Sequence, residues 1–324
     1  MFIFLLTFVV LNCYCQQGDS LIKVTSQLYM ITGHGGNVTI LVTDEGVLVV
    51  DAGTVKKDGE IITNHIESVT DKPVKYIILT HYHSDHAFGV CGFKDSPVVI
   101  GHKNIVSNLE NFGQRSIERY SKNLKIKVED LKEIIDSLKS FSNQEYLEAE
   151  EHYKSHLDQL QNAEETFIVY PDITFESEMT IYLGSDTITL IHPGNNHTDC
   201  NILVSFKNQN VLSTGDFFFN HSMPYIDFNA NCDTKNWINQ IDNYADKNYQ
   251  YIIPGHGKLA NTEDLREQGR YISDLRNEIK SLIEQQKTLE DIKNLVKMPD
   301  YSHLEFQYML PIEIDAIYKE LTER

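Results

Sequence analysis

The residues best suited to chemistry are His81, His83, Asp85 and His86, which form an H-x-H-x-D-H pattern directly after a short apolar stretch. Side chains two residues apart in an extended chain point the same way, so His81 and His83 can reach one metal ion. Asp85 and His86, where the chain turns toward its next element, can reach a second ion. Chance produces this pattern in roughly one of a thousand such sequences, so it is a specific signal.

Three more candidates follow strand-like segments in the second half of the chain: His197 in GNNHTD, Asp216 in STGD and His256 in IPGHG. Imidazole and carboxylate ligands suit zinc, and two ions that share one water suit hydrolysis. A carboxylate such as that of Asp216 is able to bridge two ions. The sequence therefore predicts a metal centre whose ligands come from several loops.

In this order the motifs resemble those of the metallo-β-lactamase superfamily, with Asp51 at the end of a strand as a fifth match. The resemblance covers roughly residues 21–258, apart from an insertion. It implies that one metal ion is held by His81, His83 and His197. It implies that a second ion is held by Asp85, His86 and His256, that Asp216 bridges the two, and that Asp51 orients a ligand loop from behind.

The fold that the resemblance implies is an α/β fold, an αββα sandwich with the site at one edge. The residue pattern agrees with it. Leu21–Asp51 has the alternation and turn signals of an antiparallel meander, a helix is predicted near Asp58–Val69, and a strand is predicted at Tyr76–Leu79. Strands are also expected at Met179–Leu183, Thr187–Ile191, Ile202–Phe206, Val211–Ser213 and Tyr251–Ile253, with a helix near Lys235–Ala245.

Two helical additions are predicted. Residues 111–165 are rich in Lys, Glu, Ser and Gln, and their apolar side chains recur at helical spacing, which predicts a helical hairpin that either caps the site or packs outside it. Residues 261–324 form a second addition. It contains a long amphipathic helix with Ile272 and Leu275, then helices at Thr288–Val296 and Pro311–Leu321.

The resemblance also bears on activity. Related di-iron proteins carry an acidic residue in place of His83, so His83 favours zinc, and the all-His/Asp ligand set is similar to that of glyoxalase II and lactonases. We therefore expect a hydrolase with two Zn²⁺ per chain. It would cleave a small-molecule amide, lactone, ester or thioester by attack of a metal-bound hydroxide, which Asp85 orients. The alternatives are an iron-dependent sulfur or oxygen redox enzyme and a catalytically silent metal-binding protein.

Candidate substrate contacts are His34, His221 and Tyr225. His34 lies in a GHGG turn of the kind that borders substrate in this superfamily, although the residues by themselves favour a solvent-exposed turn histidine. His221 and Tyr225 lie in GDFFFNHSMPYID, a stretch similar to one in exported β-lactamase-like hydrolases. The aromatic residues of this stretch serve either the pocket or the core.

The N-terminal segment and the charge bear on location and partners. Phe2–Leu11 has the length of a signal-peptide core, and Cys13-Tyr14-Cys15 offers a cleavage site, so residues 1–15 are expected to be removed and 16–324 to form the mature hydrolase domain. The protein is then secreted or periplasmic, and no membrane is a partner unless Cys13 or Cys15 is lipidated. The net charge of −19 disfavours nucleic acid. Cys91, Cys200 and Cys232 indicate no disulfide framework.

Overall fold

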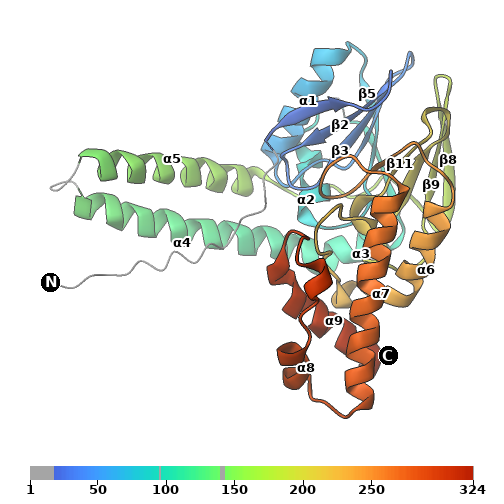
Figure 1. The fold of residues 1–324 in the computed structure, drawn as a ribbon. Coiled ribbons are helices and arrows are strands. Elements are labelled where there is room, and N and C mark those ends of the chain that lie inside the picture. The colour runs from blue at the N-terminus through green and yellow to red at the C-terminus, as the bar shows by residue number, and fades with distance from the viewer. Residues whose placement is uncertain (1–17, 95, 139–142, 324) are drawn as a thin grey trace.

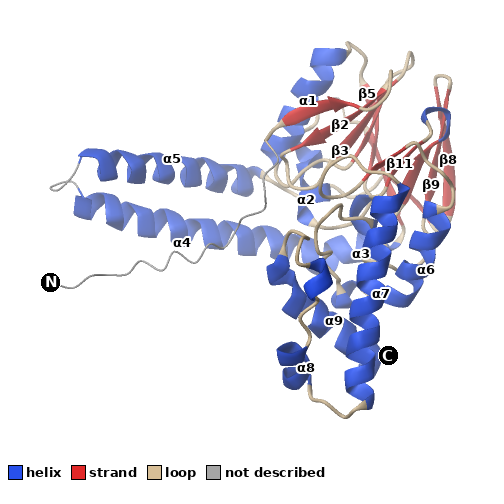
Figure 2. Ribbon diagram, in the orientation of Figure 1, coloured by secondary structure: helices blue, strands red, loops and turns tan. Residues whose placement is uncertain are grey.

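The structure, a computed structural model, describes residues 18–94, 96–138 and 143–323. The expected signal peptide at residues 1–15, with Cys13 and Cys15, lies outside the described residues. Within these ranges the chain forms two β-sheets with helices against their outer faces (Figures 1 and 2). In the same ranges, no helix combines the length and the apolar character that a membrane span needs.

The first sheet has seven strands in sequence order. They are β1 (Ser20–Lys23), β2 (Leu28–Thr32), β3 (Val38–Val42), β4 (Val47–Val50), β5 (Val74–Ile78), β6 (Val98–His102) and β7 (Ile173–Phe175). Strands β1 to β4 are antiparallel, which is the predicted meander, whereas β4 to β7 pair in parallel. Parallel pairing brings the carboxyl ends of β4 and β5 to the same edge of the sheet.

The second sheet has five strands in the order β12-β11-β10-β9-β8. They are β8 (Glu178–Leu183), β9 (Asp186–Ile191), β10 (Leu203–Phe206), β11 (Val211–Ser213) and β12 (Tyr251–Ile253). Strands β8 to β11 are antiparallel, and β11 and β12 are parallel. The carboxyl ends of β11 and β12 therefore also lie together.

Three apolar clusters explain the layered architecture. One joins the inner faces of the two sheets, and includes Leu48 and Ile78 from the first sheet and Val204 from the second. A second lies between the first sheet and helix α1 (Lys56–Val69), and a third lies between the second sheet and helices α6 (Thr234–Ala245) and α7 (Thr262–Glu284). Each layer buries one apolar face, so the αββα sandwich predicted for this chain is the observed fold.

A helical hairpin projects from the sandwich (Figure 1). It consists of α4 (Gln114–Leu138) and α5 (Asn143–Glu165), which pack mainly against each other. The apolar spacing predicts these helices, but it does not predict β6 and β7, which flank the hairpin in sequence. Strand β7 has only three residues, none of them buried, so it carries little local signal.

The C-terminal helices extend the apolar cluster on the outer face of the second sheet. They are α7, α8 (Leu289–Leu295) and α9 (Leu310–Glu323). Helix α7 packs against α6, and α9 packs against α7 and α8. Glu313 of α9 is fully buried, and Tyr271 of α7 donates a hydrogen bond to its Oε2, while Oε1 has no partner. Burial raises the pKa of Glu313 to about 8, so this carboxyl group stays protonated between about pH 4.5 and 8, where glutamate is normally charged.

Candidate metal centre

The seven predicted ligands leave the ends of strands from both sheets. His81 and His83 follow β5, and Asp85 and His86 belong to the short helix α2 (Ser84–Ala87) that comes next. His197, Asp216 and His256 come from the segments after β9, β11 and β12. The fold brings all seven together at one edge of the sandwich, in two groups of ligand atoms with Asp216 at the junction.

The first group consists of His81, His83 and His197. The Nδ1 atom of His83 lies 3.1 Å from Nε2 of His81 and 3.1 Å from Nε2 of His197. Four ligands at tetrahedral positions around a zinc ion, each 2.0–2.1 Å from it, are separated by about 3.3 Å. Asp216 Oδ2 provides a fourth atom, 3.5 Å from Nε2 of both His81 and His197, so the spacing of these four atoms fits a zinc ion.

The second group consists of Asp85, His86 and His256. Nε2 of His256 lies 3.2 Å from Oδ2 of Asp85 and 3.4 Å from Nε2 of His86. The other oxygen of Asp216, Oδ1, lies 3.0 Å from His86 Nε2 and 3.3 Å from His256 Nε2. The two oxygens of Asp216 are thus divided between the two groups, which is the geometry of a bridging carboxylate.

Asp216 Oδ1 is buried and makes no hydrogen bond. A buried carboxylate oxygen without a hydrogen-bond partner costs free energy unless a charge lies beside it. Two histidine nitrogens of suitable ligand type, Nε2 of His86 and of His256, lie beside this oxygen. The donor set and this oxygen together fit a dinuclear site for a metal that prefers nitrogen and oxygen ligands, such as zinc.

Each of four histidines is held through the ring nitrogen that faces away from the cluster. Nδ1 of His86 lies 2.8 Å from Asp51, Nδ1 of His81 lies 3.0 Å from the Thr80 hydroxyl, and Nδ1 of His197 donates to the Tyr225 carbonyl at 2.5 Å. Nε2 of His83 lies 3.0 Å from Asp227. Such contacts fix the orientation of a ligand ring and leave its other nitrogen for a metal.

Asp51 occupies the position that the sequence predicts for it. It directly follows β4 in a left-handed conformation, with φ of 65°, and accepts hydrogen bonds from the amide and hydroxyl of Thr80 as well as from His86. It therefore links the end of β4 to the ligand-bearing segment after β5. A left-handed aspartate is uncommon, and these three hydrogen bonds stabilise it here.

Asp227 has the corresponding role for His83, and no sequence pattern predicts it. Its carboxylate accepts from His83 and from the hydroxyl of Tyr82, and it also caps the turn at Asn229 and Ala230. Burial alone would raise the pKa of Asp227, but the contacts with His83 and Tyr82 more than offset this and hold the pKa well below its usual value. Nothing in the spacing of Asp227 marks it, since its partner is 144 residues away.

The electrostatics of the two groups differ. Burial lowers the pKa of His81, and lowers that of His197 to about 4, so both are neutral imidazoles, the form that binds metals. Burial would also lower the pKa of His256, but Asp216 and Asp85 offset it and raise the pKa to about 9. Asp85 and Asp216 thus favour a positive charge at the second group, whereas the histidines of the first group are neutral.

Of the three predicted substrate contacts, only His34 lines the cavity beside the centre. His34 is only 6% exposed, so the interpretation as a solvent-exposed turn histidine is wrong. His221 is exposed and lies 3.3 Å from Glu267 on α7, away from the cavity lining. The ring of Tyr225 packs against the rings of His83 and His197, and its backbone carbonyl accepts a hydrogen bond from Nδ1 of His197. Of the neighbouring aromatic residues, Phe217 and Phe218 are fully buried core residues.

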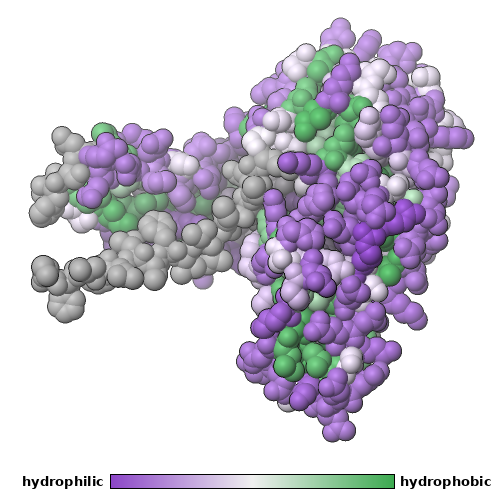
Figure 3. All heavy atoms as spheres, viewed as in Figure 1, coloured by the Kyte–Doolittle hydropathy of each residue, from purple (hydrophilic) through white to green (hydrophobic). Residues whose placement is uncertain are grey.

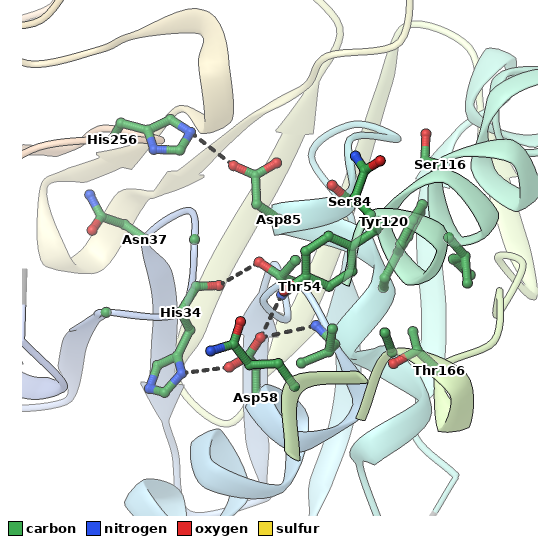
Figure 4. A pocket seen from close by; sticks show the side chains of 18 of the residues that line it. His34, Asn37, Thr54, Asp58, Ser84, Asp85, Ser116, Tyr120, Thr166 and His256 are labelled. Carbon is green, nitrogen blue, oxygen red and sulfur yellow. Dashed lines mark hydrogen bonds and ion pairs between the residues drawn. The ribbon is translucent and has the colours of Figure 1, made fainter. Parts of the chain in front are cut away.

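A cavity of about 1000 Å³ opens over the second group (Figure 4). Asp85 and His256 form its inner end, and the GHGG turn forms one side. The opposite wall comes from the base of the hairpin, including Arg119, Tyr120 and Lys127 of α4. The base of the hairpin therefore borders the site, while the rest of it projects away (Figure 1).

Two close approaches make the site compact. A Cβ atom on Gly36 would lie 2.2 Å from Cε1 of His86, and a Cβ atom on Gly255 would lie 2.2 Å from Oδ1 of Asp216. Real Cβ atoms essentially never come so close, so both positions require glycine to let the backbone reach the ligands.

The sandwich and the two-part histidine–carboxylate cluster at its edge define an αββα metalloprotein. The family model of the metallo-beta-lactamase superfamily matches residues 31–256, and the chain belongs to this superfamily, whose members are metal-dependent hydrolases. A curated relative, the metallo-beta-lactamase type 2 of Elizabethkingia meningoseptica, is 22% identical over 227 residues, which are 69% of this chain and 70% of the relative.

Solved structures show the same fold. The sec-alkylsulfatase Pisa1 from a Pseudomonas species matches 94% of this chain with a TM-score of 0.68 and 17% identity, and this chain spans only half of that protein. The metallo-beta-lactamase from Pontibacter korlensis matches 78% of this chain and 99% of its own, with a TM-score of 0.55 and 18% identity. DIM-1 metallo-beta-lactamase matches 79% and 97%, with a TM-score of 0.54 and 16% identity.

Proposed function

We propose that this protein is an exported hydrolase that uses two zinc ions to cleave a small-molecule amide, lactone, ester or thioester. The observation that carries the proposal is the division of the two Asp216 oxygens between two groups of three ligands. When bound, zinc ions supply a Lewis acid and lower the pKa of water to about 7.

The residues of the chain have distinct tasks in this proposal. Two of the ligands, Asp85 and His256, line the cavity, and Asp85 is the carboxylate of this pair, so we assign to it the tasks of orienting the attacking water and taking up its proton. Asp51 and Asp227 hold His86 and His83 in position. The walls of the cavity, including those from the hairpin, position the substrate above these groups.

Arg119 gives a reason to expect a substrate with a negative charge. Arg119 lines the cavity and makes no ion pair with an acidic side chain among the residues that the structure describes. It is also near enough to Tyr225 to lower the pKa of that phenol, although burial and Asp227 outweigh this effect and raise the pKa to about 12. An unpaired arginine in such a position suits a carboxylate or sulfate group.

A sec-alkyl sulfate is a second candidate substrate. The match to the alkylsulfatase covers 94% of this chain, whereas the matches to two β-lactamase structures cover 78% and 79%. Turnover of a panel of β-lactam, lactone, thioester, phosphodiester and sec-alkyl sulfate substrates by zinc-loaded protein separates these possibilities. If none of the substrates is cleaved, the hydrolase proposal fails.

The proposal predicts a large effect of Asp216→Ala. The loss of the shared carboxylate should release mainly the second zinc ion and lower turnover by roughly a hundredfold or more, because two positive ions lose the anion between them. Elemental analysis, circular dichroism and turnover are measured on one preparation. Asp242→Ala, at an exposed carboxylate of α6, is the control and should change none of these.

The outcome of the same analysis also tests the metal. Two zinc ions per wild-type chain support the proposal, whereas stoichiometric iron would favour a redox enzyme. An Asp216→Ala variant that retains two tightly bound zinc ions and near-normal turnover would remove Asp216 from the site.

A further inference from the structure

Another group of ligand-type side chains lies outside the candidate metal centre. Asp19, just before β1, His34 in the GHGG turn and His65 on α1 offer ligand atoms that lie within 4.8 Å of one another. Both histidine Nε2 atoms face the same oxygen of Asp19, Oδ1, at 3.3 Å for His34 and 2.5 Å for His65. Three segments that are separate in the sequence thus converge on one point.

The arrangement behind His34 repeats the arrangement behind His86. Nδ1 of His34 lies 2.9 Å from Oδ1 of Asp58 (Figure 4), as Nδ1 of His86 lies 2.8 Å from Asp51. The other oxygen of Asp58 accepts from the amides of Thr54 and Val55, so this carboxylate is fixed by the start of α1. In both cases the ring is oriented through Nδ1 and presents Nε2, as in metal sites.

We propose that Asp19, His34 and His65 form a third divalent-cation site, suited to zinc and separate from the candidate dinuclear centre. The spacing of Asp19 and His34 fits two ligands of a tetrahedral ion, which are about 3.3 Å apart. His65 and Asp19 are partly exposed, with 22% and 50% of their side-chain surface accessible, so they can move apart to admit an ion and leave room for water as a fourth ligand.

A pair of surface histidines elsewhere shows what distinguishes this group. His221 and His303 both contact Glu267, but they lie on opposite oxygens of the carboxylate, at 3.3 Å and 3.0 Å. Their nitrogens therefore do not converge, whereas those of His34 and His65 meet at a single oxygen. The histidine–carboxylate contact at His303 is an internal control for a plain hydrogen bond.

An ion at this third site would link the N-terminal segment to the cavity. Asp19 precedes the edge strand β1, and His34 belongs to the turn in which the amide of Gly36 donates to the carbonyl of Asp85. The ion would therefore hold together β1, α1 and the turn that packs on a residue of the dinuclear centre. Binding to the folded state alone would also stabilise the fold, as any such ligand does.

Metal counting tests the third site. Wild-type protein without a histidine tag is equilibrated with buffered free zinc and analysed for bound metal beside His65→Ala, Asp19→Asn and the control His303→Ala. We expect His65→Ala and Asp19→Asn each to bind one zinc ion fewer than wild type, and His303→Ala to match wild type. Equal zinc content in wild type and both site variants would overturn the proposal and leave a hydrogen-bonded cluster only.

The test is independent of the proposed function. The difference between wild type and His65→Ala reports the third site, whereas the number of ions left in His65→Ala reports the dinuclear centre. Hydrogen exchange gives a second readout, because zinc should slow exchange of the β1 amides, Ser20–Lys23, in wild type but not in His65→Ala. Exchange that zinc slows equally in both proteins would also contradict the proposal.

Discussion

The two helical additions to the sandwich differ in how they pack. Along α7 the apolar side chains Leu265, Tyr271, Ile272, Leu275 and Ile279 are all fully buried against the second sheet and its neighbours. The hairpin has few buried side chains, and its core consists of Leu124, Leu160 and Ala163. Figure 3 shows hydrophilic side chains along its upper edge with an apolar patch below them.

This difference assigns different tasks to the two additions. The C-terminal helices bury their apolar side chains in the cluster that includes the second sheet, so they contribute mainly to stability. The hairpin covers little of the sandwich but supplies one wall of the cavity. We therefore expect changes in α7 and α9 to act on folding, and changes at the base of α4 to act on substrate binding.

The largest expected effect comes from a substitution that creates a cavity beside α7. Leu275→Ala removes a fully buried side chain and should lower the free energy of unfolding by about 2–5 kcal/mol. Its counterpart in the hairpin, Leu147→Ala, removes a side chain that is 55% exposed and should change stability by less than about 0.5 kcal/mol. Urea unfolding of both variants measures this, and equal losses would break the comparison.

The buried carboxyl group of α9 gives a pH-dependent effect. Because the pKa of Glu313 is about 8 in the folded state and near the ordinary value of 4.5 when unfolded, its contribution to stability is full below pH 4.5 and is lost as the pH rises through 8. Within this window each pH unit costs at most about 1.4 kcal/mol.

Glu313→Gln removes this proton linkage and keeps an acceptor for Tyr271. The variant should gain stability relative to wild type as the pH rises from 5 to 8, which thermal unfolding at several pH values measures. Glu323→Gln, at the exposed end of the same helix, is the control. A constant difference between the Glu313 variant and wild type across this range would contradict the burial of an ionisable carboxyl.

The smallest effect is expected from Arg119→Ala in the hairpin. Loss of a charged hydrogen bond to an anionic substrate should raise KM by about tenfold, since such a bond contributes roughly 1.5 kcal/mol, and should leave the melting temperature unchanged. Arg115→Ala is the matched control, because Arg115 is also exposed on α4 but does not line the cavity. If both variants behave alike, Arg119 does not contact the substrate.

Much of the candidate metal centre could be predicted because four of its ligands form one short sequence motif. His81, His83, Asp85 and His86 are adjacent in sequence, and the superfamily resemblance adds the remaining ligands in order. Cys91, Cys200 and Cys232 are free, as the absence of a predicted disulfide framework requires. The αββα layers follow from strand and helix patterns together with the same resemblance.

What the sequence did not reveal depends on contacts between distant segments. Asp227 orients His83 only because the chain after β11 returns to the ligand loop, and Arg119 reaches the cavity only because the base of α4 packs beside it. His34 is buried because Asp58 and Asp19, from two other segments, lie against its ring. Local sequence patterns carry no information about such contacts between distant segments.

The two ends of the hairpin lie next to each other. A Cβ atom on Gly113, before α4, would lie 3.1 Å from Cδ1 of Ile168, after α5, and the Thr166 hydroxyl accepts from the amide of Lys56 in α1. Mutations that lengthen, shorten or exchange the hairpin therefore need not stretch the sandwich. Selection could thus remodel one wall of the cavity for a new substrate while the metal ligands and the core remain unchanged.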